Sequence, residues 1–254
     1  MRPWLRLTAG VACASLLGGC ATGATPLAGS TRAASTPAPA TRQPAGGTAT
    51  GRAGASQRPS AGPALADPLA GHQLITLTAP SYGDTYATFT AYRRAGGRWR
   101  RVLGPWTARI GRNGFAPPGQ KREGDGRTPS GTFRFGFLFG VLPNPGVQFR
   151  YRQSNSYDYW DDDPASPRYN EWVDTRRASP GLSPEPMDVW AYDYGAVIGY
   201  NTARTPGLGS AIFLHQNIGI ATAGCVTLPT GDLLRVLRWL DPARSPRIRM
   251  GVAT

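Results

Sequence analysis

Gly209-Ser210-Ala211-Ile212-Phe213-Leu214-His215 is the stretch around which the rest of the chain is organised, together with Thr222-Ala223-Gly224-Cys225-Val226-Thr227-Leu228. Each stretch contains an apolar run, and a Gly-containing turn delivers a cysteine to the start of the second run, ten positions after the histidine. This pattern is typical of two adjacent strands that carry a base and a thiol nucleophile. We therefore interpret His215 and Cys225 as a catalytic pair.

The first 20 residues have the order of an export signal. Arg2 and Arg6 precede an apolar stretch over residues 7–17, and small residues then lead to a cysteine. The end of this segment, Leu17-Gly18-Gly19-Cys20, resembles a bacterial lipobox, which predicts cleavage before Cys20 and lipidation of that cysteine. The apolar run is too short for a spanning helix. A plain secretory signal with a coincidental cysteine is the alternative, and either interpretation places the mature protein outside the cytoplasm.

Residues 21–70 consist mainly of Ala, Thr, Gly, Pro and Ser with scattered Arg, and contain almost no large apolar side chain. Such a segment cannot bury enough surface to offset its ordering entropy, so we expect a disordered tether. A flexible chain of this length has an average reach of roughly 40 Å. The sequence thus predicts a folded domain over residues 71–254, held off the outer face of the cell membrane by a lipid anchor. A merely tolerated low-complexity tail is the alternative.

The net charge of +13 permits nucleic acid, anionic lipid or an anionic cell-wall polymer as a neighbour. The export signal argues against nucleic acid, as does the absence of a basic helix or an aromatic RNA-binding signature. Six arginines and one aspartate give the first 70 residues about +5, which leaves about +8 for the predicted domain.

The mature domain is expected to keep a single thiol, because Cys13 leaves with the signal and Cys20 carries the lipid. A lone free thiol in an oxidising compartment is a liability unless it is used, which favours a functional Cys225 over a buried inert one. Besides His72 at its edge, the domain offers only His215 and Cys225 as nitrogen or sulfur ligands, so we expect no metal ion and no cofactor. The lack of a resolving cysteine argues against a redox protein.

Strands dominate the secondary structure that the sequence predicts. Short segments rich in β-branched and aromatic residues, separated by Gly and Pro turns, are predicted as strands over residues 74–78, 86–93, 99–110, 132–137, 189–194, 196–200, 211–215 and 246–250. A helix is predicted to begin at Thr230 and to end at Asp241-Pro242, with one apolar face formed by Leu233, Leu234, Leu237 and Leu240. The fold class is therefore mainly β, a sandwich or barrel-like sheet assembly with one clear helix after the cysteine strand.

Residues 144–186 are irregular and rich in aromatic side chains, and such a segment inside a compact domain is often a binding loop or lid. Its aromatic residues are suited to stacking on sugar or peptide, and the acidic run 161–163 to meeting a cationic group. The alternative is that the aromatic residues pack the loop down and the acids are solvated. Candidate substrate-binding residues here and before the histidine strand are Trp160, Tyr169, Asn170, Tyr200, Asn201 and Ser210.

The motifs together resemble the YkuD family of L,D-transpeptidase catalytic domains, in the branch typical of actinobacterial lipoproteins. The resemblance rests on the two stretches quoted above and on Lys121 with Glu123-Gly124-Asp125-Gly126-Arg127-Thr128-Pro129-Ser130-Gly131-Thr132-Phe133, and it covers residues 71–254. The Thr-Pro-x-Gly-x-Phe turn is weak evidence alone and strong evidence beside the ordered His and Gly-Cys pattern. The fold implied is the mainly β fold of that family.

The resemblance implies a mechanism. His215 takes the proton of Cys225, and the thiolate attacks a carbonyl of a peptidoglycan stem tetrapeptide, releasing D-Ala and leaving a thioester. Transfer to an amine on another stem then forms a 3→3 cross-link. We expect an imidazolium to lower the thiol pKa, and backbone N–H groups around Thr222, Ala223 and Gly224 to stabilise the oxyanion. A main-chain carbonyl near the cysteine is expected to orient the histidine.

Two other functions share these residues. Transfer to water would make the protein an L,D-carboxypeptidase or another amide hydrolase, and a peptidoglycan-binding module without turnover is the third interpretation. The chain also departs from the common family pattern, because Ala223 and Thr227 stand where many members have His and Arg, and Gln216-Asn217 stands in place of Gly-Thr. The nucleophile and base are retained, while contacts that orient the stem or select the acceptor are expected to differ.

Overall fold

The computed structural model describes residues 71–253, which contain strands, one α-helix and two 3-10 helices. The longer strands are β1 Gln73–Ala79, β2 Tyr86–Ala95, β3 Arg98–Arg109, β6 Gly131–Gly140, β11 Gly195–Ile198, β12 Phe213–Gln216, β13 Val226–Leu228 and β14 Arg247–Val252. The shorter strands are β4 Phe115–Ala116, β5 Thr128–Pro129, β7 Tyr151–Gln153, β8 Asp158–Asp161, β9 Glu171–Asp174 and β10 Glu185–Pro186. The helices are α1 Thr230–Trp239, η1 Trp190–Tyr192 and η2 Pro242–Arg244.

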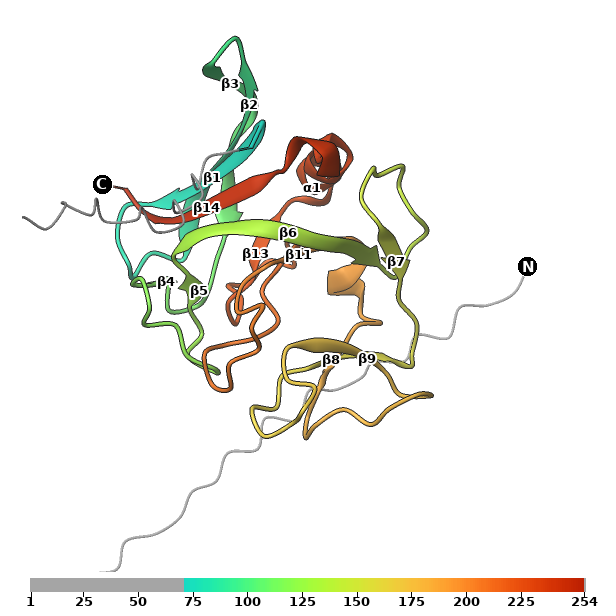
Figure 1. Ribbon diagram of the computed structural model, residues 1–254. Coiled ribbons are helices and arrows are strands. Elements are labelled where there is room, and N and C mark those ends of the chain that lie inside the picture. Colours follow the sequence, from blue (N-terminus) through green and yellow to red (C-terminus); the bar gives the residue numbers. More distant parts are fainter. Residues whose placement is uncertain (1–70, 254) are drawn as a thin grey trace, which may run out of the picture. The chain divides into compact units, whose positions relative to one another are not determined.

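Eight of these strands close into a ring. Their order is β11-β12-β13-β3-β2-β1-β14-β6, and the pairing of β11 with β6 completes the circuit, while β7 adds to β6 from outside. β1 is hydrogen-bonded along both edges, to β2 and to β14. In Figure 1 the β2–β3 hairpin projects from one side of the ring and the β8–β9 pair lies on the other. The predicted mainly β class with one helix is confirmed.

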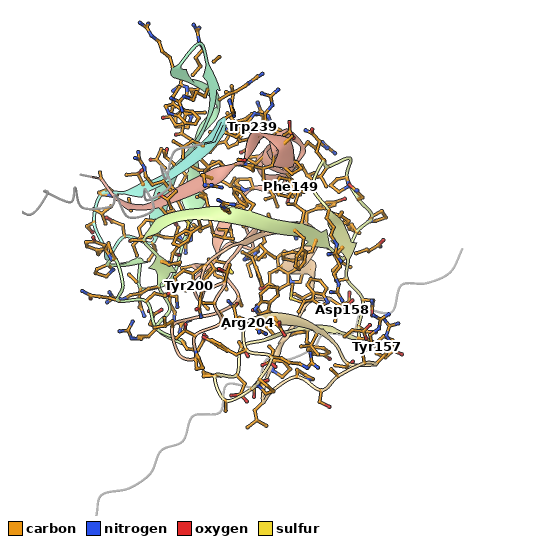
Figure 2. The ribbon with its side chains drawn as sticks, in the orientation of Figure 1. Phe149, Tyr157, Asp158, Tyr200, Arg204 and Trp239 are labelled. Atoms are coloured by element: carbon orange, nitrogen blue, oxygen red, sulfur yellow. The ribbon has the colours of Figure 1, made fainter. Side chains whose placement is uncertain are left out.

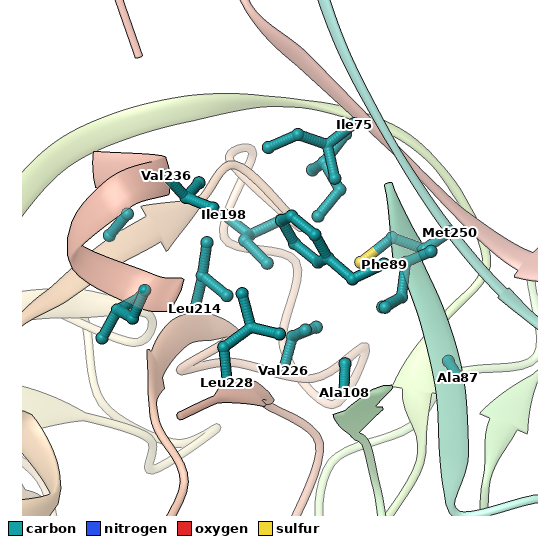
Figure 3. Packing of buried hydrophobic residues seen from close by; sticks show 14 of the residues in the cluster. Ile75, Ala87, Phe89, Ala108, Ile198, Leu214, Val226, Leu228, Val236 and Met250 are labelled. Atoms are coloured by element: carbon teal, nitrogen blue, oxygen red, sulfur yellow. The ribbon is translucent and has the colours of Figure 1, made fainter. Parts of the chain in front are cut away.

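The core of the ring follows from alternation along the strands. In β1, Ile75 and Leu77 are completely buried, whereas Thr76 and Thr78, which alternate with them, face outward. Figure 3 shows the ring of Phe89 among buried aliphatic side chains contributed by β11, β12, β13 and β14. Each such side chain contributes roughly 1.5–3 kcal/mol on full burial, so the period-two pattern of the sequence specifies which face of each strand lies inside.

Helix α1 packs against β12 and β13, the two strands of the organising motif. Asp232 lies in its first turn and Arg238 in its last, where each charge opposes the nearer end of the helix dipole. The predicted helix is confirmed, but its buried face differs in one position. Val236 is fully buried, whereas Leu234 is only half-buried, because the inward stripe is formed by Leu233, Val236, Leu237 and Leu240.

Residues 144–186 are more regular than the sequence indicates. They contain β7 to β10, and β10-β8-β9 form a separate three-stranded sheet. Asp158 accepts hydrogen bonds from Trp172 Nε1 at 2.7 Å and from Arg152 at 3.0 Å, and Asp161 accepts one from the Gly181 N–H at 2.9 Å. These strands are short and carry buried acids, so their sequence has no apolar alternation to reveal them.

The strand predicted over residues 189–194 is wrong, because Trp190–Tyr192 forms the 3-10 helix η1. Val189 and Tyr192 do point toward a shared apolar cluster, but they do so across one helical turn, which is closed by a hydrogen bond of 2.8 Å from the Tyr192 N–H to the Val189 carbonyl.

The expectations for the signal segment, for lipidated Cys20 and for the tether over residues 21–70 fall outside the described residues. Among residues 71–253 no helix is long and apolar enough to cross a membrane.

Candidate active site

Two parallel strands bring His215 and Cys225 to one pocket. β12 and β13 pair with Leu214 opposite Val226, and Cys225 comes directly before β13. Leu214 and Val226 face the core of the ring, so His215 and Cys225, which alternate with them, point outward. Both line a pocket of about 620 Å³. The predicted adjacency of the two strands is therefore observed.

The turn before the cysteine is held by two threonine hydroxyls. Thr222 Oγ1 accepts a hydrogen bond from the Gly224 N–H at 3.1 Å and donates to the Cys225 carbonyl at 2.7 Å. Thr128 of β5 donates to the Gly224 carbonyl at 2.8 Å. A Cβ at Gly224 would lie 3.0 Å from the Arg127 carbonyl oxygen, so a glycine permits this close approach. The Thr-Pro segment thus supports the backbone beside the thiol.

The thiol of Cys225 is enclosed by backbone groups. Cys225 is 8% exposed. Its Sγ accepts a hydrogen bond from the Phe213 N–H at 3.3 Å and donates one to the Ala211 carbonyl at 3.1 Å. Burial raises the pKa of the Cys225 thiol well above its ordinary value, and the charge of Glu185 raises it further, while the Phe213 N–H and Lys121 act in the opposite direction. The resting thiol is therefore protonated.

The imidazole of His215 is oriented by a main-chain carbonyl. Its Nδ1 lies 3.2 Å from the Ala191 carbonyl oxygen, and the ring of Tyr192 packs edge-on against it with centroids 5.0 Å apart. Because a carbonyl only accepts, Nδ1 carries the proton and Nε2 keeps its lone pair. Burial lowers the pKa of His215 to about 4, although its backbone hydrogen bonds favour the charged form. The carbonyl is on η1, a segment that sequence alone does not place here.

The expectation of a resting imidazolium that lowers the thiol pKa is wrong for this structure. Both groups are buried, and burial disfavours the charged form of each, so the neutral thiol and neutral imidazole are the stable pair. A thiolate at Cys225 therefore requires a group that accepts its proton, and His215, with a free lone pair on Nε2, lines the same pocket.

Three carboxylic acids line the pocket from distant parts of the chain, namely Glu123, Asp162 and Glu185. Burial raises the pKa of Glu185 to about 7, and Tyr192 donates a hydrogen bond to its Oε1. Burial and the charge of Glu123 raise the pKa of Asp162 to about 6. Because the acids do not form a motif, the sequence gives no sign that they converge on the thiol.

Two cationic residues share the pocket wall. Lys121 is 5% exposed, and its Nζ is committed to Asp125 Oδ1 at 2.8 Å and to the Arg122 carbonyl. Arg112 lies at the exposed edge of the pocket and has no ion pair with any described residue. The pocket therefore presents one available cation at its mouth and a cluster of acids within it.

The sequence of this chain matches a known protein family. A family model described as the YkuD L,D-transpeptidase catalytic domain matches residues 84–248, more than half of the chain. The chain belongs to this family. A crystal structure of the helical cell shape determining protein Pgp2 from Campylobacter jejuni is similar, with a TM-score of 0.36 and 12% identity over 72% of this chain and 49% of that one. The chain thus spans about half the length of Pgp2. No curated protein matches.

The other predicted site residues divide into three groups. Ser210, Thr222, Ala223 and Gly224 line the pocket with the YkuD histidine and cysteine. Tyr169 and Asn201 are engaged elsewhere: the Tyr169 hydroxyl contacts Glu123 and accepts from the Gly209 N–H, and Asn201 bonds the Gly209 carbonyl at 2.9 Å. The residues Trp160, Asn170 and Tyr200 line a second hollow of about 320 Å³. Figure 2 labels Tyr200 and Arg204 of this hollow.

Asn170 connects this second hollow to the thiol. Its Oδ1 accepts from Trp160 Nε1 at 3.0 Å and from the Ala211 N–H at 3.2 Å, and its Nδ2 donates to the carbonyls of Tyr200 and Asn201 at 3.2 and 3.0 Å. Ala211 has a left-handed φ of 51°, which is unfavourable for alanine. Its carbonyl accepts the hydrogen bond of the Cys225 thiol, so Asn170 holds a strained residue that contacts this thiol.

The departures from the common YkuD pattern have visible consequences. Ala223 leaves part of the pocket wall without an imidazole. Thr227 is buried between His215 and Arg109 in the sheet, and its hydroxyl has no hydrogen-bond partner among the described residues.

Within residues 71–253 no group of three or more His, Cys, Asp and Glu side chains is placed to hold a metal ion.

Proposed function

We propose that the protein is a cysteine-dependent L,D-transpeptidase that acts on peptidoglycan stem tetrapeptides. The observation that carries the proposal is the shared pocket of Cys225 and His215, in which the Ala191 carbonyl leaves Nε2 as the proton acceptor. Membership of the YkuD family supports the reaction class. A wall-binding module would gain nothing from a thiol that is buried beside an oriented imidazole, which favours catalysis over binding.

In the first half-reaction the substrate carbonyl between the third stem residue and D-Ala lies against Cys225. The Sγ–C bond forms as the thiol proton moves to His215 Nε2, and the amide bond then breaks while His215 returns the proton to the departing D-Ala nitrogen. Backbone N–H groups around Thr222, Ala223 and Gly224 are proposed to stabilise the oxyanion. The enzyme is left with a thioester on Cys225.

In the second half-reaction an amine of another stem attacks the thioester. The amine transfers a proton to His215, the C–N bond forms, and the thiol of Cys225 is restored when the C–S bond breaks. The acids Glu123, Asp162 and Glu185 provide an environment for a cationic amine before it is deprotonated, and Arg112 is placed to meet the terminal carboxylate of a donor stem. This distribution of charge favours an amine acceptor over water.

The test is mass spectrometry of the purified protein incubated with a disaccharide tetrapeptide, with Cys225→Ala as the control. Loss of D-Ala together with a cross-linked dimer is the expected result. Tripeptide without dimer would establish the carboxypeptidase, and no Cys225-dependent change would leave the binding module. Because the Ala variant removes only one sulfur atom from the pocket, equal binding of tetrapeptide by both proteins separates a lost reaction from a lost fold.

We further propose that Cys20 carries a lipid that anchors the enzyme to the outer face of the cell membrane, so that the catalytic domain works in the cell wall. Lipobox-like residues 17–20 and the cell-wall substrate of the family support this placement. Metabolic labelling with a fatty acid is expected to mark the wild-type protein and not Cys20→Ala. Labelling of neither protein would leave the plain secretory signal as the correct interpretation, and labelling of both would place the lipid at a residue other than Cys20.

A further inference from the structure

Five adjacent strands of the ring contain no acidic residue. β3, β2, β1, β14 and β6 include nine arginines and not one aspartate or glutamate. None of these arginines forms an ion pair with a described residue, although seven other basic residues do. The nine residues are Arg93, Arg94, Arg98, Arg100, Arg101, Arg109, Arg134, Arg247 and Arg249.

The strand register places most of them on one surface. Ile75 and Ile248 point into the core, so the residues between the core positions of each strand point outward. Arg247 is opposite Arg134, and Arg101 is opposite Tyr92, on this outer side. We call this surface the arginine face; its basic residues are Arg94, Arg101, Arg134, Arg247 and Arg249, and Figure 2 shows nitrogen-tipped side chains along the hairpin that borders it. Arg109 is not part of it, because Arg109 lies opposite Thr227, which in turn lies opposite His215.

The fold places like charges side by side here. Arg247 pairs with Arg134 across the sheet on this face, and Arg93 pairs with Arg100 on the other side of the β2–β3 hairpin. Like charges directly opposite in a sheet are destabilising. Burial, and after it the charge of Arg134, lowers the pKa of Arg247. Since no described acid offsets this repulsion, an anionic group outside the chain is its natural counterpart.

The arginine face lies opposite the candidate active site. In the eight-membered ring β1 is four strands away from β12 in either direction, so outward side chains on β1 and on β12 point to opposite sides. β1 is also where the described chain begins, and the His72 carbonyl accepts from the Arg94 N–H at 2.9 Å. The segment that leads back toward Cys20 therefore meets the domain at the arginine face.

Aromatic residues accompany the arginines. Trp99 on the hairpin is half-buried beneath Arg94, and Tyr92, also half-buried, lies opposite Arg101. Arginine binds phosphate through two parallel hydrogen bonds, and Tyr and Trp rings are favoured at the headgroup level of membranes. The mixture suits a broad phosphate-bearing surface that also accepts apolar contact.

We propose that the arginine face docks on the anionic phospholipid surface of the membrane and turns the pocket of Cys225 away from it. The lipid headgroups neutralise the unpaired guanidinium groups, and the opposite wall of the ring presents the pocket to peptidoglycan. Docking does not depend on catalysis, so this inference stands apart from the proposed reaction. It adds a second attachment that fixes an orientation, which a flexible tether alone does not provide.

The test measures vesicle binding by the full chain carrying Cys20→Ala, which prevents lipidation. The arginine-face variant is Arg94→Gln/Arg101→Gln/Arg249→Gln, and the matched control removes the same charge elsewhere as Arg150→Gln/Arg168→Gln/Arg177→Gln. All six positions are exposed. Vesicles of phosphatidylcholine alone are compared with vesicles that also contain phosphatidylglycerol. Each lost contact weakens binding to the anionic vesicles about fivefold, hence about 100-fold for the arginine-face variant and little for the control.

Equal loss in both variants, or no loss in either, would overturn the proposal, because the charges would then act without regard to position. The protein with an unaltered arginine face should bind the anionic vesicles less tightly as salt is raised, since salt screens exposed charges that lie more than about 10 Å apart. Vesicle binding that does not weaken with salt would also overturn the proposal. A third arm uses an insoluble glycerol-phosphate polymer. If the arginine-face variant loses only polymer binding and keeps vesicle binding, the partner is a wall polymer and the membrane proposal is wrong.

Discussion

The pocket and the arginine face place charge in opposite ways. In the pocket, Glu185 is buried against Tyr192, and Glu123 accepts from Ser210 at 2.7 Å, so each of these acids has a fixed partner. On the arginine face Arg94, Arg101, Arg134 and Arg249 are exposed and Arg247 is half-buried, and none has an acidic partner among residues 71–253. Charged side chains with a hydrogen-bond partner are held in fixed positions, whereas charged side chains without one create an electrostatic field that acts over a whole surface. Substitutions should therefore have sharp effects in the pocket and graded effects on the face.

The largest effect is expected for His215→Ala. His215 is the proposed acceptor of the thiol proton, and the two hydrogen-bond contacts of Sγ, the Phe213 N–H and the Ala211 carbonyl, offer no base in its place. Removing the imidazole should therefore lower the rate of D-Ala release about 1000-fold. His72→Ala is the matched control, since it removes the second histidine of the chain, which is exposed. A loss below tenfold in His215→Ala would exclude the proposed role of the imidazole.

Asn170→Ala tests how far the pocket depends on fixed partners. The change leaves the Ala211 N–H, Trp160 Nε1 and two carbonyl groups without their hydrogen bonds. We expect the free energy of unfolding to fall by about 3 kcal/mol. Urea denaturation measures this loss, and Asn113→Ala, an exposed residue with one bond to the Asp125 carbonyl, serves as control and should lose less than about 1 kcal/mol. Equal losses would mean that the network adds nothing.

Glu185→Gln should make Cys225 more reactive. The Glu185 charge raises the thiol pKa, so its removal should increase alkylation of Cys225 at pH 8 by about tenfold.

The Glu185→Gln variant should also be relatively more stable at high pH. Because the folded-state pKa of Glu185 is raised from 4.5 to about 7, the native state binds more protons than the unfolded chain in that window, and stability falls as pH rises through it. Unfolding curves at pH 5 and pH 8 measure this slope, which should flatten in the variant; an unchanged slope would refute the assignment.

The smallest effect is expected on the hairpin of the arginine face. Arg100→Gln relieves the repulsion from Arg93 and should stabilise the protein by a few tenths of a kcal/mol, with D-Ala release from a soluble substrate unchanged. Thermal unfolding detects the sign of such a shift, and the gain should shrink as salt is added. Destabilisation instead would indicate that Arg100 makes a contact worth more than the repulsion.

The strands, the helix and the His215–Cys225 pair were accessible from sequence because each has a local signature. Alternating Ile75 and Leu77 specify a buried strand face, and the Gly-Cys turn marks the nucleophile. The acids of the pocket were not accessible, since Glu123, Asp162 and Glu185 come from separate loops and strands that only the tertiary fold brings together.

The backbone group that orients His215 could not be predicted from the sequence either. The resemblance to YkuD enzymes predicts a carbonyl that orients His215, but not that it belongs to Ala191, because a main-chain atom has no residue type to recognise. The segment around it alternates like a strand, and packing of Tyr192 against Phe213 and His215 imposes a helical turn instead. The neutral state of the thiol likewise follows from burial, which the spacing of two residues does not encode.

β1 carries a mechanical consequence. It is the first strand of the described chain, it is hydrogen-bonded to β2 on one edge and to β14 on the other, and it lies midway around the ring from β12. A pull on its N-terminal end along the strand axis loads the bonds on both edges together, in shear, rather than opening them one after another. A force that enters the domain at this end is therefore carried first by the bonds of β1 to β2 and β14, four strands away in the ring from the strand that holds His215.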